Sequence, residues 1–148
     1  MFQKIALFGF AFKKDTGDTR ESAAIDVAKH LMDEGALLSI YDPKVSYQQI
    51  CRDLNYSDGI SNGHANDKGF QVMKNPYEAA LKAHAIVICT EWDEFKSYDY
   101  YKIYDGMEKP AFIFDGRKMM DHEMLEEIGF KVKSIGKNLD HKNKHLLI

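Results

Sequence analysis

Residues 4–41, KIALFGFAFKKDTGDTRESAAIDVAKHLMDEGALLSIY, decide the fold of this chain. Lys4 to Phe8 (KIALF) is a short apolar run, which is typical of a fully buried strand, and Leu37 to Tyr41 (LLSIY) predicts a second strand. Between them, Phe10 to Asp18 has the polar composition of a loop, and Thr19 to Glu34 has a helical pattern. This unit of strand, loop, helix and strand spans about forty residues, the size of a βαβ crossover.

The helix expected at Thr19 to Glu34 is indicated by its apolar spacing and by its ends. Apolar residues recur at helical spacing at Ala24, Val27, Ala28 and Leu31. Asp18 and Glu21 place negative charge near the positive end of the helix dipole, and Gly35 is a natural C-terminal stop.

The same alternation of strands and helices continues along the chain. Further strands are expected at Ala85 to Cys89, Ala111 to Phe114 and Val132 to Ile135. Further helices are expected at Ser46 to Leu54, Pro76 to Lys82, Trp92 to Met107 (in pieces) and Asp121 to Ile128. Asn55 to Gly69 and Lys137 to Ile148 are polar and lack a period, so we expect a loop and a tail there. The pattern predicts an α/β fold, a Rossmann-like three-layer sandwich with a mostly parallel sheet.

Composition fits one domain of a cytoplasmic protein. The chain has 148 residues, of which 45% are hydrophobic and 29% charged, and its net charge is −3 with both signs mixed. This balance favours neither nucleic acid nor an anionic membrane as a partner, so an anion would be held by a few placed cations. No apolar run approaches the ~20 residues of a membrane span, and no leader pattern opens the chain.

Ligands of such sheets bind beyond the carboxyl ends of the strands, which here points to the residues after Gly9, Asp42, Cys89 and Asp115. The loop from Gly9 to Ser22 stands where a dinucleotide fold carries GxGxxG, but those glycines are absent. It offers instead a ring and cations, which suit a flat base and a charged phosphate or sugar: Phe12, Lys13, Lys14 and Arg20. The alternative is a solvated polar loop.

The turn Phe114-Asp115-Gly116-Arg117-Lys118 is the second candidate. Arg117 follows a glycine that lets backbone approach a ligand, so it is placed to bind phosphate or sugar oxygens. The alternative is a surface turn in which Asp115 bonds the local backbone.

Other reactive residue types show no catalytic or metal-binding pattern. Cys51 and Cys89 have no evident base or CxxC spacing, so we interpret them as structural thiols of a reducing compartment. The histidines show no ligand spacing, and no metal is expected. Asp42 imitates the ribose-binding acid of NAD folds, but without the glycine fingerprint we interpret it as a helix or turn cap.

Four segments in a fixed order carry a resemblance to a known family. They are GFAFKKDTGDTRES (Gly9 to Ser22), YDPKV (Tyr41 to Val45), ICTEWDEF (Ile88 to Phe95) and AFIFDGRK (Ala111 to Lys118). In order and spacing they resemble the C-terminal, UDP-binding domain of the animal-type UDP-glucose 6-dehydrogenases. The resemblance implies that residues 1–137 form that domain and that residues 138–148 are a tail.

The resemblance also implies roles for individual residues. Phe12 and Lys13 would contact the UDP-sugar, and Arg117 would bind the same substrate. Arg20 would reach an NAD that is held mainly by an N-terminal dehydrogenase domain. No catalytic residue is expected in this chain, because the family's nucleophilic cysteine lies in a GGSCF-like segment that these residues lack.

The family oxidises UDP-glucose twice, with two NAD, to UDP-glucuronate, and its full enzymes are homo-oligomers. We therefore expect this chain to bind UDP or UDP-glucose as part of such an oxidoreductase and to be inactive alone. Two alternatives stay open: a stand-alone nucleotide-binding or interaction module without catalysis, and a domain of a related nucleotide-sugar dehydrogenase.

Overall fold

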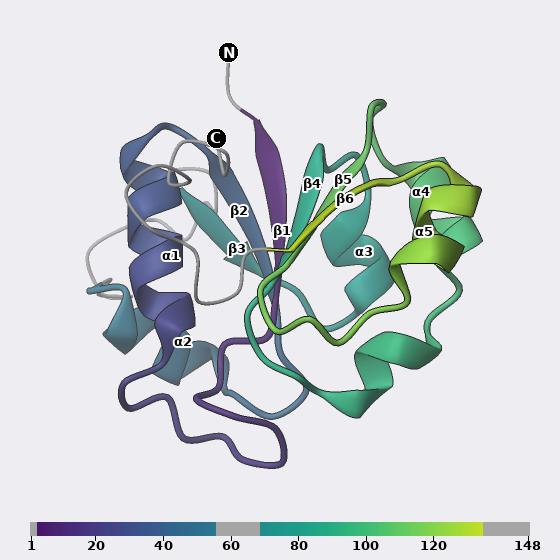
Figure 1. Ribbon diagram of the computed structural model, residues 1–148. Coiled ribbons are helices and arrows are strands. Elements are labelled where there is room, and N and C mark those ends of the chain that lie inside the picture. The colour runs from purple at the N-terminus through teal and green to yellow at the C-terminus, as the bar shows by residue number, and fades with distance from the viewer. Residues whose placement is uncertain (1–2, 56–68, 135–148) are drawn as a thin grey trace.

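A computed structural model of the protein describes residues 3–55 and 69–134. In this part of the chain six strands form one sheet in the order β3-β2-β1-β4-β5-β6 (Figure 1). The strands are β1 (Lys4–Phe8), β2 (Leu37–Tyr41), β3 (Phe70–Val72), β4 (Ala85–Ile88), β5 (Phe112–Asp115) and β6 (Lys131–Ser134). Every neighbouring pair is parallel, so the expected mostly parallel sheet is parallel throughout the described residues.

Helices cover both faces of the sheet, which confirms the expected α/β fold with three layers. In Figure 1, α1 and α2 lie on one side of the sheet, and α3, α4 and α5 lie on the other. The helices are α1 (Ala23–Asp33), α2 (Tyr47–Asp53), α3 (Pro76–Ala80), α4 (Tyr100–Gly106) and α5 (His122–Ile128), with a 3-10 helix η2 (Asp93–Ser97) between β4 and α4. None of the helices within the described residues has the length and apolar composition needed to cross a membrane.

The core lies along the two central strands. Residues 5–8 of β1 and all four residues of β4 are buried, because parallel strands in the middle of such a sheet are covered on both faces. The outer strand β6 is largely exposed and carries Lys131 and Lys133. Edge lysines of this kind discourage pairing with another chain.

The first helix starts later than its sequence pattern indicates. The expected start was Thr19, but α1 begins at Ala23, and Ser22 caps it by accepting a hydrogen bond from the Ala24 N–H. Glu21 has a left-handed φ of 59°, which is incompatible with a helix. The expected C-terminal stop is confirmed: Gly35 follows the helix with a φ of 91°.

The remaining helix predictions are confirmed with small shifts at their ends. Ser46, Asn75 and Asp121 each cap the helix that follows by accepting hydrogen bonds from its first backbone N–H groups. The stretch from Trp92 to Met107 is helical in two pieces, η2 and α4, as expected.

The short outer strand β3 was not predicted from the sequence, and its three residues pair with β2. The last strand lies at Lys131–Ser134 rather than Val132 to Ile135. Three expectations fall outside the described residues: most of the loop at Asn55 to Gly69, the tail at 138–148, and the domain boundary at residue 137.

Candidate functional site

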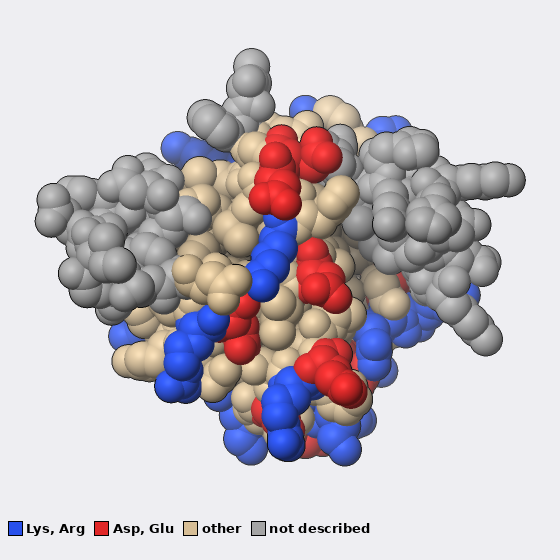
Figure 2. Space-filling view, turned by 90° about the vertical axis from the view of Figure 1, so that its left-hand side faces the viewer, with Lys and Arg blue, Asp and Glu red and all other residues tan. Residues whose placement is uncertain are grey.

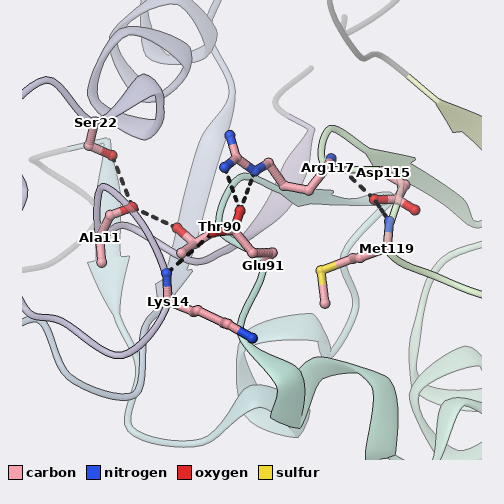
Figure 3. A network of polar contacts seen from close by, with 8 residues as sticks. All are labelled: Ala11, Lys14, Ser22, Thr90, Glu91, Asp115, Arg117 and Met119. Atoms are coloured by element: carbon pink, nitrogen blue, oxygen red, sulfur yellow. Dashed lines mark hydrogen bonds and ion pairs between the residues drawn. The ribbon is translucent and has the colours of Figure 1, made fainter.

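The strand order reverses direction at β1, which pairs with β2 on one side and β4 on the other. In parallel sheets the ligand site lies beyond the carboxyl ends of the strands at such a switch point. Three segments meet there: residues 9–22 after β1, residues 89–92 after β4 and residues 115–121 after β5 (Figure 3).

The loop after β1 is pressed against the end of β4. Gly9 has a φ of +93°, and a Cβ on it would lie 2.5 Å from the Thr90 Cβ, so only glycine fits. The Thr90 Oγ1 donates to the Ala11 carbonyl oxygen at 2.8 Å, and the Ser22 Oγ donates to the Phe10 carbonyl oxygen at 2.9 Å. Both hydroxyls are buried, so they fix the backbone at the two ends of this loop.

Asp42 joins the loops after β1, β2 and β4. Its Oδ1 accepts from the Lys44 and Val45 N–H groups, which confirms the expected turn cap. Its Oδ2 accepts from the Phe10 and Ala11 N–H groups at 2.7 and 3.0 Å and from the Trp92 Nε1 at 3.1 Å. A carboxylate with five internal donors has no oxygen left for a ribose hydroxyl.

The outer part of the first loop carries the predicted ring and cations. The Phe12 N–H donates to the Asp18 carbonyl oxygen at 2.8 Å and closes the loop, and Phe12 is 47% exposed. Lys13 is also exposed, and within residues 3–55 and 69–134 no hydrogen bond or ion pair holds its side chain. Phe12 and Lys13 are therefore both available to a ligand.

Arg20 lies at the same loop but is already paired. Its Nε and Nη2 donate to the Asp18 carboxylate at 3.1 and 2.7 Å. The hydrogen bonds from Arg20 lower the pKa of Asp18 to about 2. A hollow of about 480 Å³ lies here, lined by Phe12, Asp18, Arg20 and Glu21.

The turn after β5 is organised by the buried Asp115. Burial raises the pKa of its carboxyl, but hydrogen bonds outweigh this effect and hold the pKa below its ordinary value. The donors are the Met120, Met119 and Arg117 N–H groups and the His122 ring. The local backbone bonding expected of Asp115 is therefore confirmed. Gly116 is pressed so closely on β4 that a Cβ would lie 2.8 Å from the Ile88 carbonyl oxygen.

Arg117 reaches from this turn toward the other two segments. Its Nε–H donates to the Glu91 Oε2 at 2.5 Å, and its Nη2 forms an ion pair with the same oxygen at 2.5 Å. The Glu91 Oε1 accepts from the Lys14 N–H at 3.4 Å, so one carboxylate connects the segments after β1 and β5 (Figure 3). Glu91 was not predicted as a site residue from the sequence, although it belongs to the segment ICTEWDEF.

The thiols lack the environment of a nucleophile. Burial raises the pKa of the Cys89 thiol to about 12, and the nearby Arg117 offsets this only in part. Cys51 is buried. Within the described ranges, no three His, Cys, Asp or Glu side chains converge in a way that could hold a metal ion.

The turn after β1 does not fit the pyrophosphate of a dinucleotide. It lacks the glycine pattern that lets a pyrophosphate rest on the helix N-terminus, and Asp42 is occupied by protein donors.

Among the described residues, the side of the molecule that carries α1 has no surface of a single charge sign. Figure 2 shows basic and acidic side chains interspersed there.

Comparison with known proteins places this arrangement in a family. The family model "UDP-glucose/GDP-mannose dehydrogenase family, UDP binding domain" matches residues 6–122. The chain belongs to this family. The match runs from within β1 to beyond β5 and includes the three segments at the carboxyl edge.

Relatives with high identity are UDP-glucose 6-dehydrogenases. The Drosophila melanogaster enzyme is 54% identical over 135 residues, which cover 91% of this chain and 28% of that protein. The Bos taurus enzyme is 55% identical over 142 residues, which cover 95% of this chain and 28% of that protein. The chain thus spans less than a third of the length of these members of the dehydrogenase family.

A solved structure agrees on the fold. The NDP-N-acetyl-D-galactosaminuronic acid dehydrogenase from Methanosarcina mazei Go1 superposes with a TM-score of 0.70 at 23% identity. The similarity covers 90% of this chain and 24% of that one. The two proteins share the α/β fold.

Proposed function

We propose that this chain is the substrate-binding part of a UDP-glucose 6-dehydrogenase, which oxidises UDP-glucose to UDP-glucuronate with two NAD. The observation that carries the proposal is the carboxyl edge of the sheet, where the segments after β1 and β5 present an exposed ring and cations, and buried side chains hold the backbone of the loops in place. The identity of 54–55% to UDP-glucose 6-dehydrogenases favours UDP-glucose over other nucleotide sugars.

Phe12, Lys13 and Arg117 are proposed to hold the substrate. The exposed Phe12 ring suits stacking against a flat base, and the free ammonium of Lys13 suits a phosphate. Arg117 lies on a turn that Asp115 and Gly116 hold rigidly, so its guanidinium presents hydrogen-bond donors from a fixed base.

Arg20 is proposed to face NAD, as the family resemblance implies. The turn after β1 does not fit a pyrophosphate, so the cofactor would be held mainly by a dehydrogenase domain outside these 148 residues. That domain would supply the nucleophilic cysteine as well, since both thiols described here are buried or have a raised pKa. Hydride transfer would then need both domains, in a cytoplasmic homo-oligomer.

Titration calorimetry of the 148-residue chain with UDP tests the proposal. We expect saturable binding of UDP and UDP-glucose, weaker binding of GDP, and no turnover of UDP-glucose with NAD. Lys13→Ala and Arg117→Ala should each weaken UDP binding about tenfold to hundredfold, the usual worth of a hydrogen bond to a charged group. Lys131→Ala is the matched control. Lys131 is an exposed lysine at the start of β6, and so it lies at the edge of the sheet opposite the carboxyl ends of the strands.

Two results would contradict the proposal in different ways. If the wild-type chain does not bind UDP at millimolar concentration, the proposed function of this chain is wrong. If it binds UDP but Lys13→Ala and Arg117→Ala behave like Lys131→Ala, the function stands and the site assignment is wrong.

A further inference from the structure

Glu91 stands between the two segments that are proposed to hold the substrate. It extends from the loop after β4, and its carboxylate contacts the segment after β1 and the segment after β5. We propose that Glu91 is a positioning residue, which orients the Arg117 guanidinium toward the UDP-sugar and sets its distance from the Phe12 and Lys13 loop. This inference rests on the proposed function for its ligand.

The two carboxylate oxygens of Glu91 contact different segments of the chain. Oε2 accepts from the Arg117 Nε–H at 2.5 Å and forms an ion pair with the Arg117 Nη2 at 2.5 Å, so two nitrogens of the guanidinium are held at one oxygen. Oε1 accepts from the backbone N–H of Lys14 at 3.4 Å. A carboxylate bonded on both sides restrains Arg117 relative to the first loop, which a single exposed ion pair would not do.

Glu91 and Arg117 each lie close in sequence to a fully buried residue. Thr90, which precedes Glu91, is 0% exposed and donates to the Ala11 carbonyl oxygen at 2.8 Å. Asp115 is also 0% exposed and accepts from the Arg117 N–H at 3.3 Å. These hydrogen bonds restrain the backbone at Glu91 and at Arg117. The two side chains are then the parts of the pair that can change conformation.

The pair leaves Arg117 able to bind a ligand. A guanidinium has five N–H donors, and one of them, the Nε–H, donates to Glu91. Figure 3 shows the third nitrogen of Arg117 directed away from Glu91. The Arg117 side chain is 39% exposed, so these donors are open to solvent. At this exposure the pair contributes little to stability, and its consequence is order in the arginine side chain.

Removing Glu91 has two opposing effects on anion binding. Without its partner, Arg117 regains rotamers that must be ordered again when the ligand binds, which weakens binding. Loss of a negative charge strengthens the attraction of the site for phosphate. Glu91→Gln and Glu91→Ala remove the same charge, but glutamine keeps an acceptor oxygen for Arg117, so their difference isolates the positioning effect.

The experiment is a double-mutant cycle with UDP as the ligand, using the 148-residue chain. We expect Glu91→Ala to bind UDP about twofold to tenfold more weakly than Glu91→Gln, the range for ordering one long side chain. In the Arg117→Ala background the two Glu91 variants should bind equally. Asp93→Ala is the matched control, since Asp93 is an exposed carboxylate near Glu91 that pairs with the Lys14 Nζ and not with Arg117.

A second readout needs no nucleotide. The Arg117 Nε–H should give a protected signal in ¹⁵N NMR spectra of the wild type, and this signal should exchange faster with water in Glu91→Ala. The inference is overturned if the Nε–H is unprotected in the wild type. It is also overturned if Glu91→Gln and Glu91→Ala bind UDP equally, or if their difference persists without Arg117. Should the wild type fail to bind UDP, the proposed function fails, and the Nε–H signal alone decides whether Glu91 orients Arg117.

Discussion

Asp42→Asn changes one atom of the carboxylate that joins three loops at the carboxyl edge. The wild-type oxygens divide five N–H donors between them, with two on Oδ1 and three on Oδ2. An asparagine replaces one oxygen with an NH₂ group, which donates and cannot accept. Whichever way the amide turns, its NH₂ group points at two or three N–H donors.

The less costly orientation places the NH₂ group against the N–H groups of Lys44 and Val45. A buried donor without an acceptor costs about 1–3 kcal/mol, and two of them would cost about 2–6 kcal/mol. Lys44 is exposed, so its N–H can bond to water, while Val45 is buried. The Val45 N–H is then the one left without an acceptor, so we expect Asp42→Asn to lower the free energy of unfolding by about 1–3 kcal/mol, out of the 5–15 kcal/mol typical of a domain.

Urea unfolding followed by circular dichroism measures this loss. Asp93→Asn is the control, because Asp93 has a side chain 70% exposed and should change the stability by less than about 0.5 kcal/mol. Hydrogen exchange at the Phe10 and Ala11 N–H groups should also become faster in Asp42→Asn. A loss of less than about 1 kcal/mol, with unchanged exchange at Phe10 and Ala11, would refute the reasoning that Asp42 holds the loops together.

Three further predictions concern the same edge. Gly9→Ala should lower the free energy of unfolding by about 3 kcal/mol or more, because its Cβ would lie 2.5 Å from the Thr90 Cβ at a φ of +93°; thermal unfolding checks this, and an unchanged Tm would contradict it. The pKa of the Asp115 carboxyl is lowered in the folded state. Its contribution to the stability of the fold is therefore present above pH 3.8 and is lost as the pH falls through the pKa of the folded state. The free energy of unfolding of Asp115→Asn should accordingly depend less on pH below 3.8 than that of the wild type, and equal slopes would count against the assignment. Cys89, with a pKa of about 12, should react with iodoacetamide at pH 8 far more slowly than a free cysteine of pKa ~8.5, which mass spectrometry can follow; equal rates would show an accessible thiolate.

The central strands could be predicted from the sequence because each rests on local signals. KIALF and AIVI are continuous apolar runs, and both are buried strands. The three-residue strand β3 gave no such signal, since only Phe70 of its residues is buried. Its place is decided by pairing with β2, which is a tertiary effect.

The start of α1 was misplaced for a related reason. Thr19 continues the polar run before the helix and looks like an N-terminal residue, but it is buried and accepts from the Ser22 N–H in a turn of its own. Glu21, which lies in this turn, has a left-handed backbone conformation, so the turn does not continue directly into the helix. Propensity alone does not distinguish a capping turn from a first helical turn.

At the candidate site, sequence motifs identified Phe12, Lys13 and Arg117 as residues of interest, and the structure brings their segments together. The contact between Glu91 and Arg117 could not be predicted, because it depends on which strands are neighbours. Glu91 and Arg117 are 26 positions apart and meet only because β4 and β5 pair in parallel register, with Ile88 beside Asp115.

The ion pairs at the carboxyl edge also bear on how a ligand arrives. Three of its cations have a carboxylate partner, namely Arg117 with Glu91, Arg20 with Asp18 and Lys14 with Asp93. Paired charges cancel at a distance, so they create little long-range field to draw an anion in from solution. Encounter would then proceed at an ordinary diffusive rate with a shallow dependence on ionic strength, and discrimination among phosphorylated metabolites would be made after contact.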